Sequence, residues 1–239
     1  MRNAIFKLAA LGIAAQFAAL AVPAFAQDAA SDTATKTFTI TGGAAVVSDY
    51  RFRGVSLDNK DFAFQPTLTV THSSGLYAGV WASNIAPNPG DDVEVDLYGG
   101  FAGGDAVTYD IGATYYVYPG FGSINYIEFT GKLGTTVGPA KLGAQVSYAP
   151  KQGSALAKDN LYTGLNAAVG VPNTPLTLTG SVGRENGAFG AKNIDWSLGA
   201  NVVYKGFTLG AQYIDTNRNT TFAAGDGKAG AVFTLSYGF

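Results

Sequence analysis

The chain has 239 residues, with 15 Lys and Arg against 17 Asp and Glu, and it contains no cysteine. The near balance of charge gives no electrostatic basis for binding nucleic acid, and the lack of cysteine excludes disulfides, thiol catalysis and cysteine metal sites. Charged residues make up only 13% of the chain, which holds 32 Gly, 13 Tyr and 15 Phe. This composition is typical of a β-structure with one face toward lipid and the other face polar.

Residues 1–26 predict a secretory signal peptide. Arg2 and Lys7 supply positive charge, an apolar run extends from Leu8 to Val22, and Ala24-Phe25-Ala26 forms a small-residue cleavage site. We expect cleavage after Ala26 and a flexible periplasmic N-terminus over residues 27–36; an uncleaved membrane anchor is the less favoured alternative. No later stretch has the ~20 consecutive, predominantly apolar residues that a membrane-spanning helix needs.

The remaining residues, 37–239, predict one domain of β-strands. Apolar residues alternate with polar or small ones in segments of about ten residues, and this period of two is the strand signature. In one such segment Phe62, Phe64 and Leu68 share a face, whereas Pro66 weakens the pattern because it cannot donate to a ladder; a local bulge could absorb it. Twelve strands are predicted, near residues 37–53, 61–71, 76–83, 93–102, 107–118, 124–134, 140–149, 160–170, 175–183, 193–204, 207–215 and 228–239.

The lengths of the connections alternate along the chain. The even-numbered connections are short, at residues 72–75, 103–106, 135–139, 171–174 and 205–206. The odd-numbered ones are longer and rich in Gly, Pro, Asn and Asp, at residues 84–92, 150–159, 184–192 and 216–227, with 119–123 as a short exception. Outer-membrane barrels have short periplasmic turns and longer external loops. The pattern therefore predicts an all-β fold, a transmembrane antiparallel up-and-down barrel of about twelve strands.

The last strand supports the same fold. Phe233, Leu235, Tyr237 and the terminal Phe239 place an apolar side chain at every second position. This finish resembles the C-terminal strand signal by which the barrel-assembly machinery recognises outer-membrane barrels. An ordinary last strand of a β-protein is the alternative interpretation.

Side-chain parity separates two faces along the predicted strands. One face is almost purely apolar, as in Leu97, Ile111 and Phe129, and we expect it to contact outer-membrane lipid and lipopolysaccharide. An Arg or Lys on that face at mid-depth would cost about 2 to 4 kcal/mol. The charged residues gather on the other face, and we predict that the pore is lined by Asp49, Arg51, Arg53, Glu94, Asp96, Asp110, Glu128, Lys132 and Asp195. Lys141 and Lys205 share this parity.

Two interpretations of the lumenal charges stay open. In the first, opposite walls carry opposite charges and set selectivity for small polar solutes. In the second, Arg51 and Arg53 pair with Glu94, Asp96, Asp110 or Glu128 and plug the barrel. A barrel of twelve strands lies between the filled eight-stranded and the open sixteen-stranded size. The aromatic residues are equally open, because Tyr77, Trp81, Tyr116, Tyr118, Tyr126 and Trp196 could form interfacial girdles or narrow the pore.

No catalytic, metal or cofactor site is predicted. His72 is the only histidine, and it stands with Ser73 and Ser74 in a turn where we do not expect the three to meet as base and nucleophile. Glu94 and Asp96 could form a carboxylate dyad or a divalent-cation site, but carboxylates two apart on a lumen wall occur without either role. We therefore predict that the chain is not an enzyme.

Several segments resemble a known family. Val47–Ser56, Ser74–Asn84 and Glu94–Gly100, together with the shorter motifs 109–112, 116–120 and 233–237, are similar to the TorF family of proteobacterial porins, and the resemblance spans nearly the whole chain after residue 26. It implies an outer-membrane channel for passive diffusion of small hydrophilic solutes, with no cofactor. The alternative hypothesis is a closed structural or surface-binding barrel without transport activity.

Overall fold

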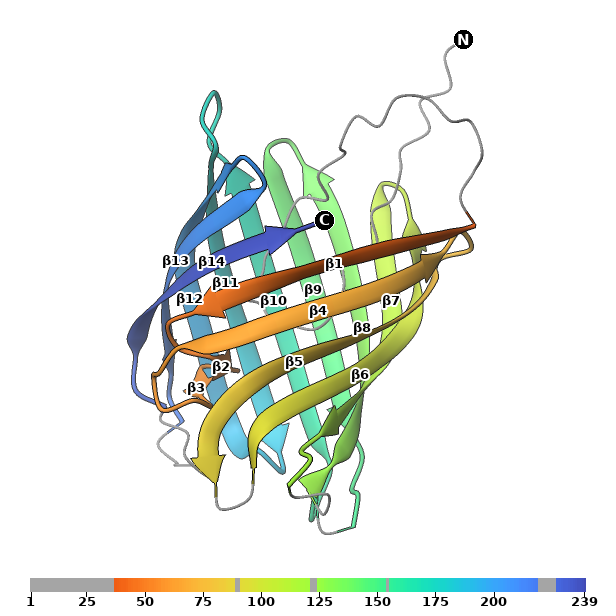
Figure 1. The fold of residues 1–239 in the computed structure, drawn as a ribbon, viewed down its shortest axis with the longest axis vertical. Helices are drawn as coiled ribbons and strands as arrows, with labels where there is room; N and C mark the ends of the chain where they lie inside the picture. The colour runs from red at the N-terminus through yellow and green to blue at the C-terminus, as the bar shows by residue number, and fades with distance from the viewer. Residues whose placement is uncertain (1–36, 89–90, 121–123, 154, 219–226) are drawn as a thin grey trace.

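A computed structural model describes residues 37–88, 91–120, 124–153, 155–218 and 227–239; the predicted signal peptide and N-terminal segment lie outside these ranges. The described residues form a closed barrel (Figure 1). Its twelve strands are β1 (Phe38–Val47), β4 (Ala63–His72), β5 (Leu76–Asn88), β6 (Asp91–Gly104), β7 (Val107–Val117), β8 (Tyr126–Val137), β9 (Ala140–Ala149), β10 (Asn160–Gly170), β11 (Leu176–Gly187), β12 (Gly190–Tyr204), β13 (Phe207–Thr216) and β14 (Gly230–Gly238). A short hairpin of β2 (Arg51–Phe52) and β3 (Val55–Ser56) is separate from the wall.

Each wall strand pairs antiparallel with its sequence neighbours, and β1 pairs with β14 to close the sheet. A closed sheet satisfies the backbone hydrogen bonds of every strand without leaving an edge. The predicted fold class is therefore confirmed. No helix among the described residues has the length and apolar character needed to cross a membrane.

The two ends of the barrel carry different connections. The turn end, where β14 finishes, holds residues 73–75, 105–106, 138–139, 171–175 and 205–206 (Figure 1). Of the described residues, the loop end holds 48–62, 118–120, 124–125, 150–153, 155–159, 217–218 and 227–229, together with the ends of β5, β6, β11 and β12. The predicted division of the connections between two ends is thus present, whereas the predicted difference in their lengths holds only in part.

Two of the predicted long loops are strand instead. β5 and β6 pair out to Asn88 and Asp91, and β11 and β12 pair out to Gly187 and Gly190. The polar and glycine residues of these segments are typical of loops in a sequence. They form strands here because a hairpin that extends into water does not need apolar side chains. Each pair contains a register shift near its tip, where the alternation is broken.

The predicted bulge at Pro66 is absent. The register between β1 and β4 is continuous from Phe38 to Val47 and includes Pro66 opposite Ala44. The amide of Phe64 points toward β5, where it binds Asn84 Oδ1, and Pro66 shares its parity. β4 and β5 pair only from Thr67 onward. Pro66 lies outside this ladder, so its lack of an N–H removes no hydrogen bond between the two strands.

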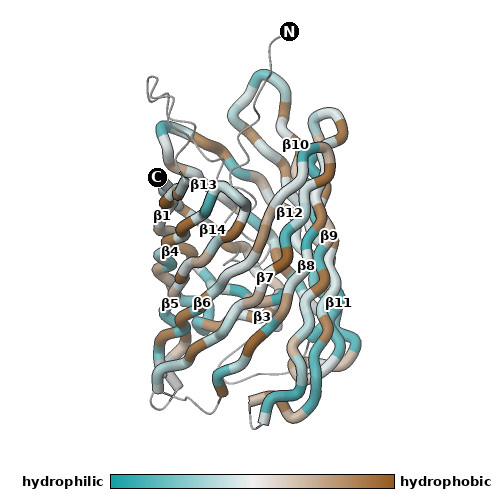
Figure 2. Tube along the Cα trace, turned by 90° about the vertical axis from the view of Figure 1, so that its right-hand side faces the viewer, coloured by the Kyte–Doolittle hydropathy of each residue, from teal (hydrophilic) through white to brown (hydrophobic). Residues whose placement is uncertain are grey.

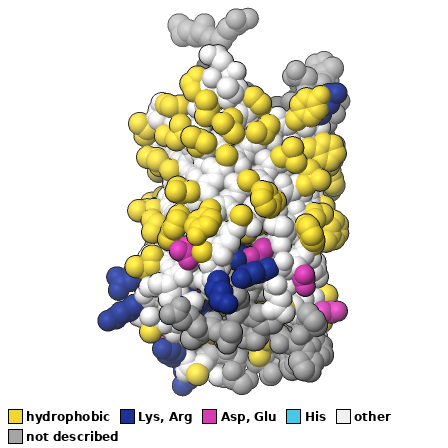
Figure 3. All heavy atoms as spheres, turned by 90° about the vertical axis from the view of Figure 1, so that its left-hand side faces the viewer, with side chains coloured by type: hydrophobic (Ala, Val, Ile, Leu, Met, Phe, Trp, Pro, Cys, Tyr) yellow, Lys and Arg dark blue, Asp and Glu magenta, His cyan; other side chains and the backbone are white. Residues whose placement is uncertain are grey.

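Hydropathy alternates along each strand (Figure 2). The outward positions are large and apolar, and Ile111, Leu198 and Leu133 are each more than half exposed. On the face shown in Figure 3 these side chains cover the wall toward the turn end, while charged side chains gather toward the loop end. The apolar face assigned from parity therefore points outward.

Candidate functional site

A segment of chain folds into the lumen directly after β1. Residues 48–62, here called the inward loop, leave the wall at Ser48, whose amide donates to Phe233 O and whose Oγ accepts from Phe233 N, at 2.9 Å each. The loop carries the β2–β3 hairpin, in which Arg53 has φ 49° and Gly54 φ 82°. Two consecutive residues with positive φ form the tight turn that favours glycine at its second position.

The inward loop is buried along most of its length. Tyr50, Phe52, Val55 and Ser56 are all less than a tenth exposed, and so is Asp58. Asp58 Oδ2 accepts from the Tyr50 amide at 2.6 Å, and Leu57 N donates to Tyr50 O at 2.7 Å. The loop has its own internal hydrogen bonds, so it is an ordered part of the lumen.

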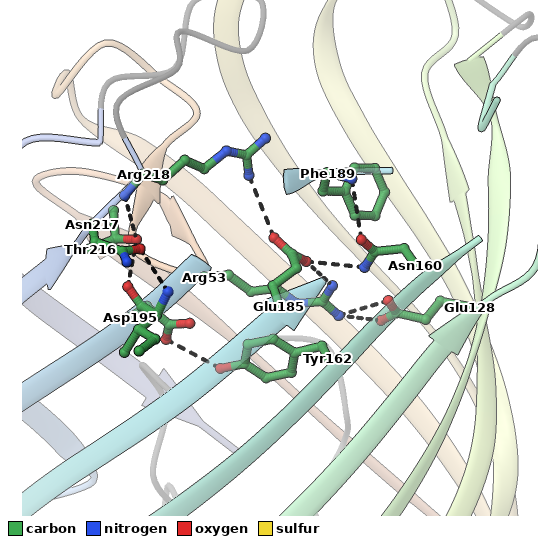
Figure 4. A network of polar contacts seen from close by, with 11 residues as sticks. Arg53, Glu128, Asn160, Tyr162, Glu185, Phe189, Asp195, Thr216, Asn217 and Arg218 are labelled. Atoms are coloured by element: carbon green, nitrogen blue, oxygen red, sulfur yellow. Dashed lines mark hydrogen bonds and ion pairs between the residues drawn. The ribbon is translucent and has the colours of Figure 1, made fainter. Parts of the chain in front are cut away.

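Arg53 is the main anchor of the inward loop (Figure 4). Its Nη2 donates to both carboxylate oxygens of Glu128 at 2.7 Å, and its Nη1 donates to Glu185 Oε1 at 2.6 Å. The guanidinium also lies over the rings of Phe52 and Tyr162, at 4.6 and 4.3 Å from their centroids. Burial lowers the pKa of Arg53, but the two carboxylates outweigh it and hold the pKa well above its usual value. The guanidinium is therefore charged.

Further contacts join Glu185 to the loops around it. Asn160 Nδ2 donates to Glu185 Oε1 at 3.1 Å, and Arg218 Nη1 lies 3.6 Å from Glu185 Oε2 (Figure 4). Removing one partner of such a buried network costs about 3 to 5 kcal/mol, because the remaining charge is left buried. The network ties the inward loop to β8, β10, β11 and the segment after β13.

Arg51 fixes the other side of the hairpin. Its Nε donates to Asp49 Oδ2 at 2.6 Å, and its Nη1 donates to the carbonyl oxygens of Gly54 and Lys228 at 3.1 and 2.8 Å. A cavity of about 30 Å3 lies beside Arg51 and Arg53, against Tyr162 and Asp195. A water molecule needs roughly 10 to 15 Å3 by this measure, so the gap is water-sized.

Aromatic and acidic groups fill the lumen on the side of β5 to β8. Tyr50 and Tyr118 donate their hydroxyls to the two oxygens of Glu94, at 2.9 and 3.0 Å. Burial and the Glu94 carboxylate raise the pKa of Tyr50 well above its usual value, so this hydroxyl keeps its proton. The Tyr50 ring meets Trp81 edge-on with centroids 5.3 Å apart. Asp96 is buried next along β6, and its Oδ1 has no hydrogen-bond partner among the described residues.

The half of the lumen toward the turn end is different. Its inward positions are mostly Gly, Ser, Thr and Asn, and they keep partial exposure although they point into the barrel: Thr71, Gly100, Gly112, Gly134, Asn166, Thr177, Asn201, Thr234 and Ser236. Asp110 and Lys132 are opposite each other in the β7–β8 register, and Tyr77 donates to Asp110 Oδ1 at 2.8 Å. This half is lined mainly by small polar side chains that are partly exposed.

The predicted pore-lining residues all lie in the interior, but three of them belong to a different structural element from the one predicted. Asp49, Arg51 and Arg53 were expected on the first strand, which ends at Val47; they belong to the inward loop. Their alternation with Tyr50 and Phe52 looks like strand because the hairpin is itself extended. The other six come from the wall: Glu94 and Asp96 on β6, Asp110 on β7, Glu128 and Lys132 on β8, and Asp195 on β12. Whether they line an open pore stays a prediction.

The interpretation in which the lumenal charges pair is correct for Arg53. It binds the predicted partner Glu128 and also Glu185, which sequence reasoning missed. Glu185 was placed in a loop, although extending the inward parity of Thr179, Ser181 and Gly183 would have reached it. Nothing in the sequence around Arg218 indicated that this residue joins the interior network. Arg51 binds Asp49 instead of a wall carboxylate. Asp195 accepts from Tyr162 at 3.2 Å, another interior residue that was not predicted.

Other expectations need correction. Lys141 and Lys205 are exposed, and Lys205 lies in the β12–β13 turn over the Tyr204 ring. Of the six aromatic residues considered for girdles, Trp196 faces outward, whereas Tyr77, Trp81, Tyr116 and Tyr126 are buried inside and Tyr118 is half-buried beside Glu94. Most of this set therefore narrows the lumen.

The turn at His72 is also tighter than expected. His72 Nδ1 lies 2.8 Å from Ser74 Oγ, so the expectation that these two side chains would not meet is wrong. The same nitrogen accepts from the Ser74 amide at 3.1 Å, and both contacts are exposed. The pair closes the turn after β4, consistent with a structural role.

Two solved structures of porins are similar in architecture to this chain. The structure titled KdgM porin matches with a TM-score of 0.58 at 5% identity, covering 83% of this chain and 98% of that one. The NanC porin structure matches with a TM-score of 0.55 at 10% identity, covering 84% and 99%. At such low identities these matches show the shared barrel fold alone.

Sequence comparison is more specific. No curated protein sequence matches the chain. A family model described as a bacterial protein of unknown function, Gcw_chp, matches residues 31–238. The chain therefore belongs to the Gcw_chp family of bacterial proteins.

Proposed function

We propose that this protein is an outer-membrane channel through which small hydrophilic solutes diffuse passively. The observation that carries the proposal is the polar inward face behind an apolar outer wall, with inward Thr177 and Ser236 partly exposed while outward Leu198 is 62% exposed. A soluble barrel would bury its apolar side chains inside. Here the arrangement is reversed, as a barrel in lipid requires.

Membrane location follows from the same reversal. The outward ring of apolar and aromatic side chains matches a lipid contact surface, and the terminal strand presents Phe233, Leu235 and Tyr237 outward. We extend the proposal to contact with lipid and lipopolysaccharide and to recognition by the barrel-assembly machinery. The shared fold with the KdgM and NanC porins and the resemblance of the sequence motifs to the TorF family support the same function.

The inward loop sets the narrowest part of the proposed path. It fills the loop end of the lumen, and the gap beside Arg51 and Arg53 is only about 30 Å3. Solutes would therefore cross a half lined mainly by small polar side chains and then a half packed with charged ones. This geometry favours ions and very small solutes over sugars.

The test is single-channel recording on the refolded chain from residue 27, with liposome swelling as a second readout. We expect small, reproducible conductance steps in planar bilayers, and swelling that falls sharply with solute size. Folding is checked beforehand by the β-signal in circular dichroism and by heat-modifiable migration in gels. Correctly folded protein that produces no steps would refute the proposal.

A closed barrel is the second candidate, and one observation favours it. Arg53 is bound by Glu128 and Glu185 together, which joins the inward loop to two separate parts of the wall. If the folded protein is silent in bilayers but variants with altered surface loops lose a binding activity, the closed barrel becomes the better description.

A further inference from the structure

The buried charges of the lumen are unequal in number. Among the described residues, seven carboxylate side chains are less than a tenth exposed, against three guanidinium groups and no buried lysine. The three arginines are Arg51, Arg53 and Arg218. The half-buried Asp110 and Lys132, opposite each other in register, add one charge of each sign. The interior therefore carries an excess of acidic groups, although the whole chain is nearly balanced.

The arginines are occupied by particular carboxylates. Arg51 binds Asp49, and Arg53 and Arg218 bind Glu185, with Glu128 shared by Arg53. These contacts hold the positive charge within the anchor of the inward loop. Arg51 Nη2 and Arg53 Nε have no hydrogen-bond partner among the described residues, but the charge of each guanidinium is already compensated by a carboxylate that an entering anion would have to displace.

The wall at β6 presents two acidic groups, and the side-chain contacts of Glu94 include tyrosine hydroxyls. Glu94 accepts hydroxyl hydrogen bonds from Tyr50 and Tyr118, and Asp96 follows two residues later on the same inward face of β6. Asp96 is 5% exposed and its Oδ1 has no partner among the described residues. A buried carboxylate oxygen without a donor is costly, and a passing cation would offset that cost.

We infer that the channel prefers small cations over anions, and that Glu94 and Asp96 form the acidic wall that imposes this preference at the constriction. Negative charge in a narrow, low-dielectric passage lowers the energy of a cation there and raises that of an anion. The inference rests on the proposed channel function. It concerns monovalent ions in transit, since the described residues contain no cluster of His, Cys, Asp or Glu suited to hold a metal ion.

The test measures the reversal potential of the wild-type channel in a KCl gradient. We expect a potential that corresponds to several-fold higher permeability for K+ than for Cl−. Replacing KCl with tetramethylammonium chloride should reduce the current more than replacing it with potassium acetate. The wild-type measurement needs no variant, so a folding defect cannot obscure it.

Charge-neutralising variants then locate the effect. Asp96→Asn, alone and with Glu94→Gln, should bring the K+ to Cl− permeability ratio toward one while conductance steps persist. Asp105→Asn is the matched control, because it removes the same charge from the exposed β6–β7 turn at the other end of the strand. It should leave the ratio unchanged.

The possible failures are distinct. Channels that are unselective or prefer Cl− would overturn the cation preference and leave the proposed channel function intact. Selectivity that survives the double variant would overturn the role of Glu94 and Asp96. Absence of any conductance from folded protein would overturn the channel function and, with it, this inference.

Discussion

The two halves of the lumen differ in the size and charge of the side chains that line them. At the loop end, long charged and aromatic side chains interlock around the inward loop, and Arg53 connects it to Glu128 and Glu185. At the turn end, inward positions are mostly small and polar, with Tyr77 among them, and none of the described residues forms a loop that enters there. One strand architecture thus yields a packed region and a region lined by small, partly exposed side chains. The pairing of the wall strands therefore sets the architecture of the barrel. The side chains and the loop inside it set how much of the lumen is filled.

Removing the anchor tests this contrast most strongly. Arg53→Met leaves Glu128 buried without its cation and Glu185 with only the more distant Arg218, so we expect the free energy of unfolding to fall by about 3 to 5 kcal/mol. We also expect larger conductance steps, because the inward loop is no longer held across the lumen. Denaturant unfolding in detergent and bilayer recording measure the two effects.

The control for the anchor is Arg184→Met. Arg184 precedes Glu185 on β11 but points outward and is exposed, where the loss of a charge costs at most about 1 kcal/mol. Adding Glu128→Gln to Arg53→Met should recover part of the lost stability, since Glu128 is then no longer a buried charge without a cation while Glu185 keeps Arg218. Equal stability of Arg53→Met and wild type would contradict the anchoring role.

The turn of the inward hairpin gives the next largest effect. Gly54→Ala introduces a side chain at φ 82°, and its Cβ would lie 2.7 Å from Thr216 Cβ. We expect a loss of about 1 to 2 kcal/mol from the left-handed backbone alone. Gly131→Ala, where an added Cβ meets nothing within 4 Å, should be close to neutral in the same unfolding measurement.

A smaller effect concerns pH. Burial, with a contribution from the neighbouring Asp49 carboxylate, raises the pKa of Asp58 to about 6. In an unfolded chain Asp titrates near 3.9, so the folded state binds the extra proton between these values and loses stability as pH rises through that window. Wild type should therefore lose more stability between pH 4 and 6.5 than Asp58→Asn. Parallel pH profiles would show that Asp58 does not titrate in this range.

The smallest expected effect lies at the turn end. Ser236→Tyr adds bulk to the inward face of β14, where the lumen is lined by small residues. Because the constriction at the loop end dominates the resistance, conductance should change little, in contrast to Arg53→Met. A large fall in conductance would mean that the turn end is also narrow, and the two halves would then differ less than we describe.

Much of the wall was predictable from residue types alone. The alternation of Phe62, Phe64 and Leu68 with Ala63 and Gln65 requires only that successive side chains of a strand point to opposite faces. The same rule failed after Val47, because an extended hairpin inside the barrel has the same alternation as a strand in its wall. It also failed at Glu185, where a polar strand tip had the composition of a loop.

The sequence by itself determined that the chain forms a β-barrel, which side chains face outward, and that acidic and basic residues share the inward face. Only the tertiary structure decided that residues 48–62 turn inward, and which carboxylates receive Arg53. The physical reason is separation along the chain. Arg53 meets Glu128 and Glu185 across 75 and 132 residues, and such contacts depend on barrel closure and strand register, which local periodicity does not encode.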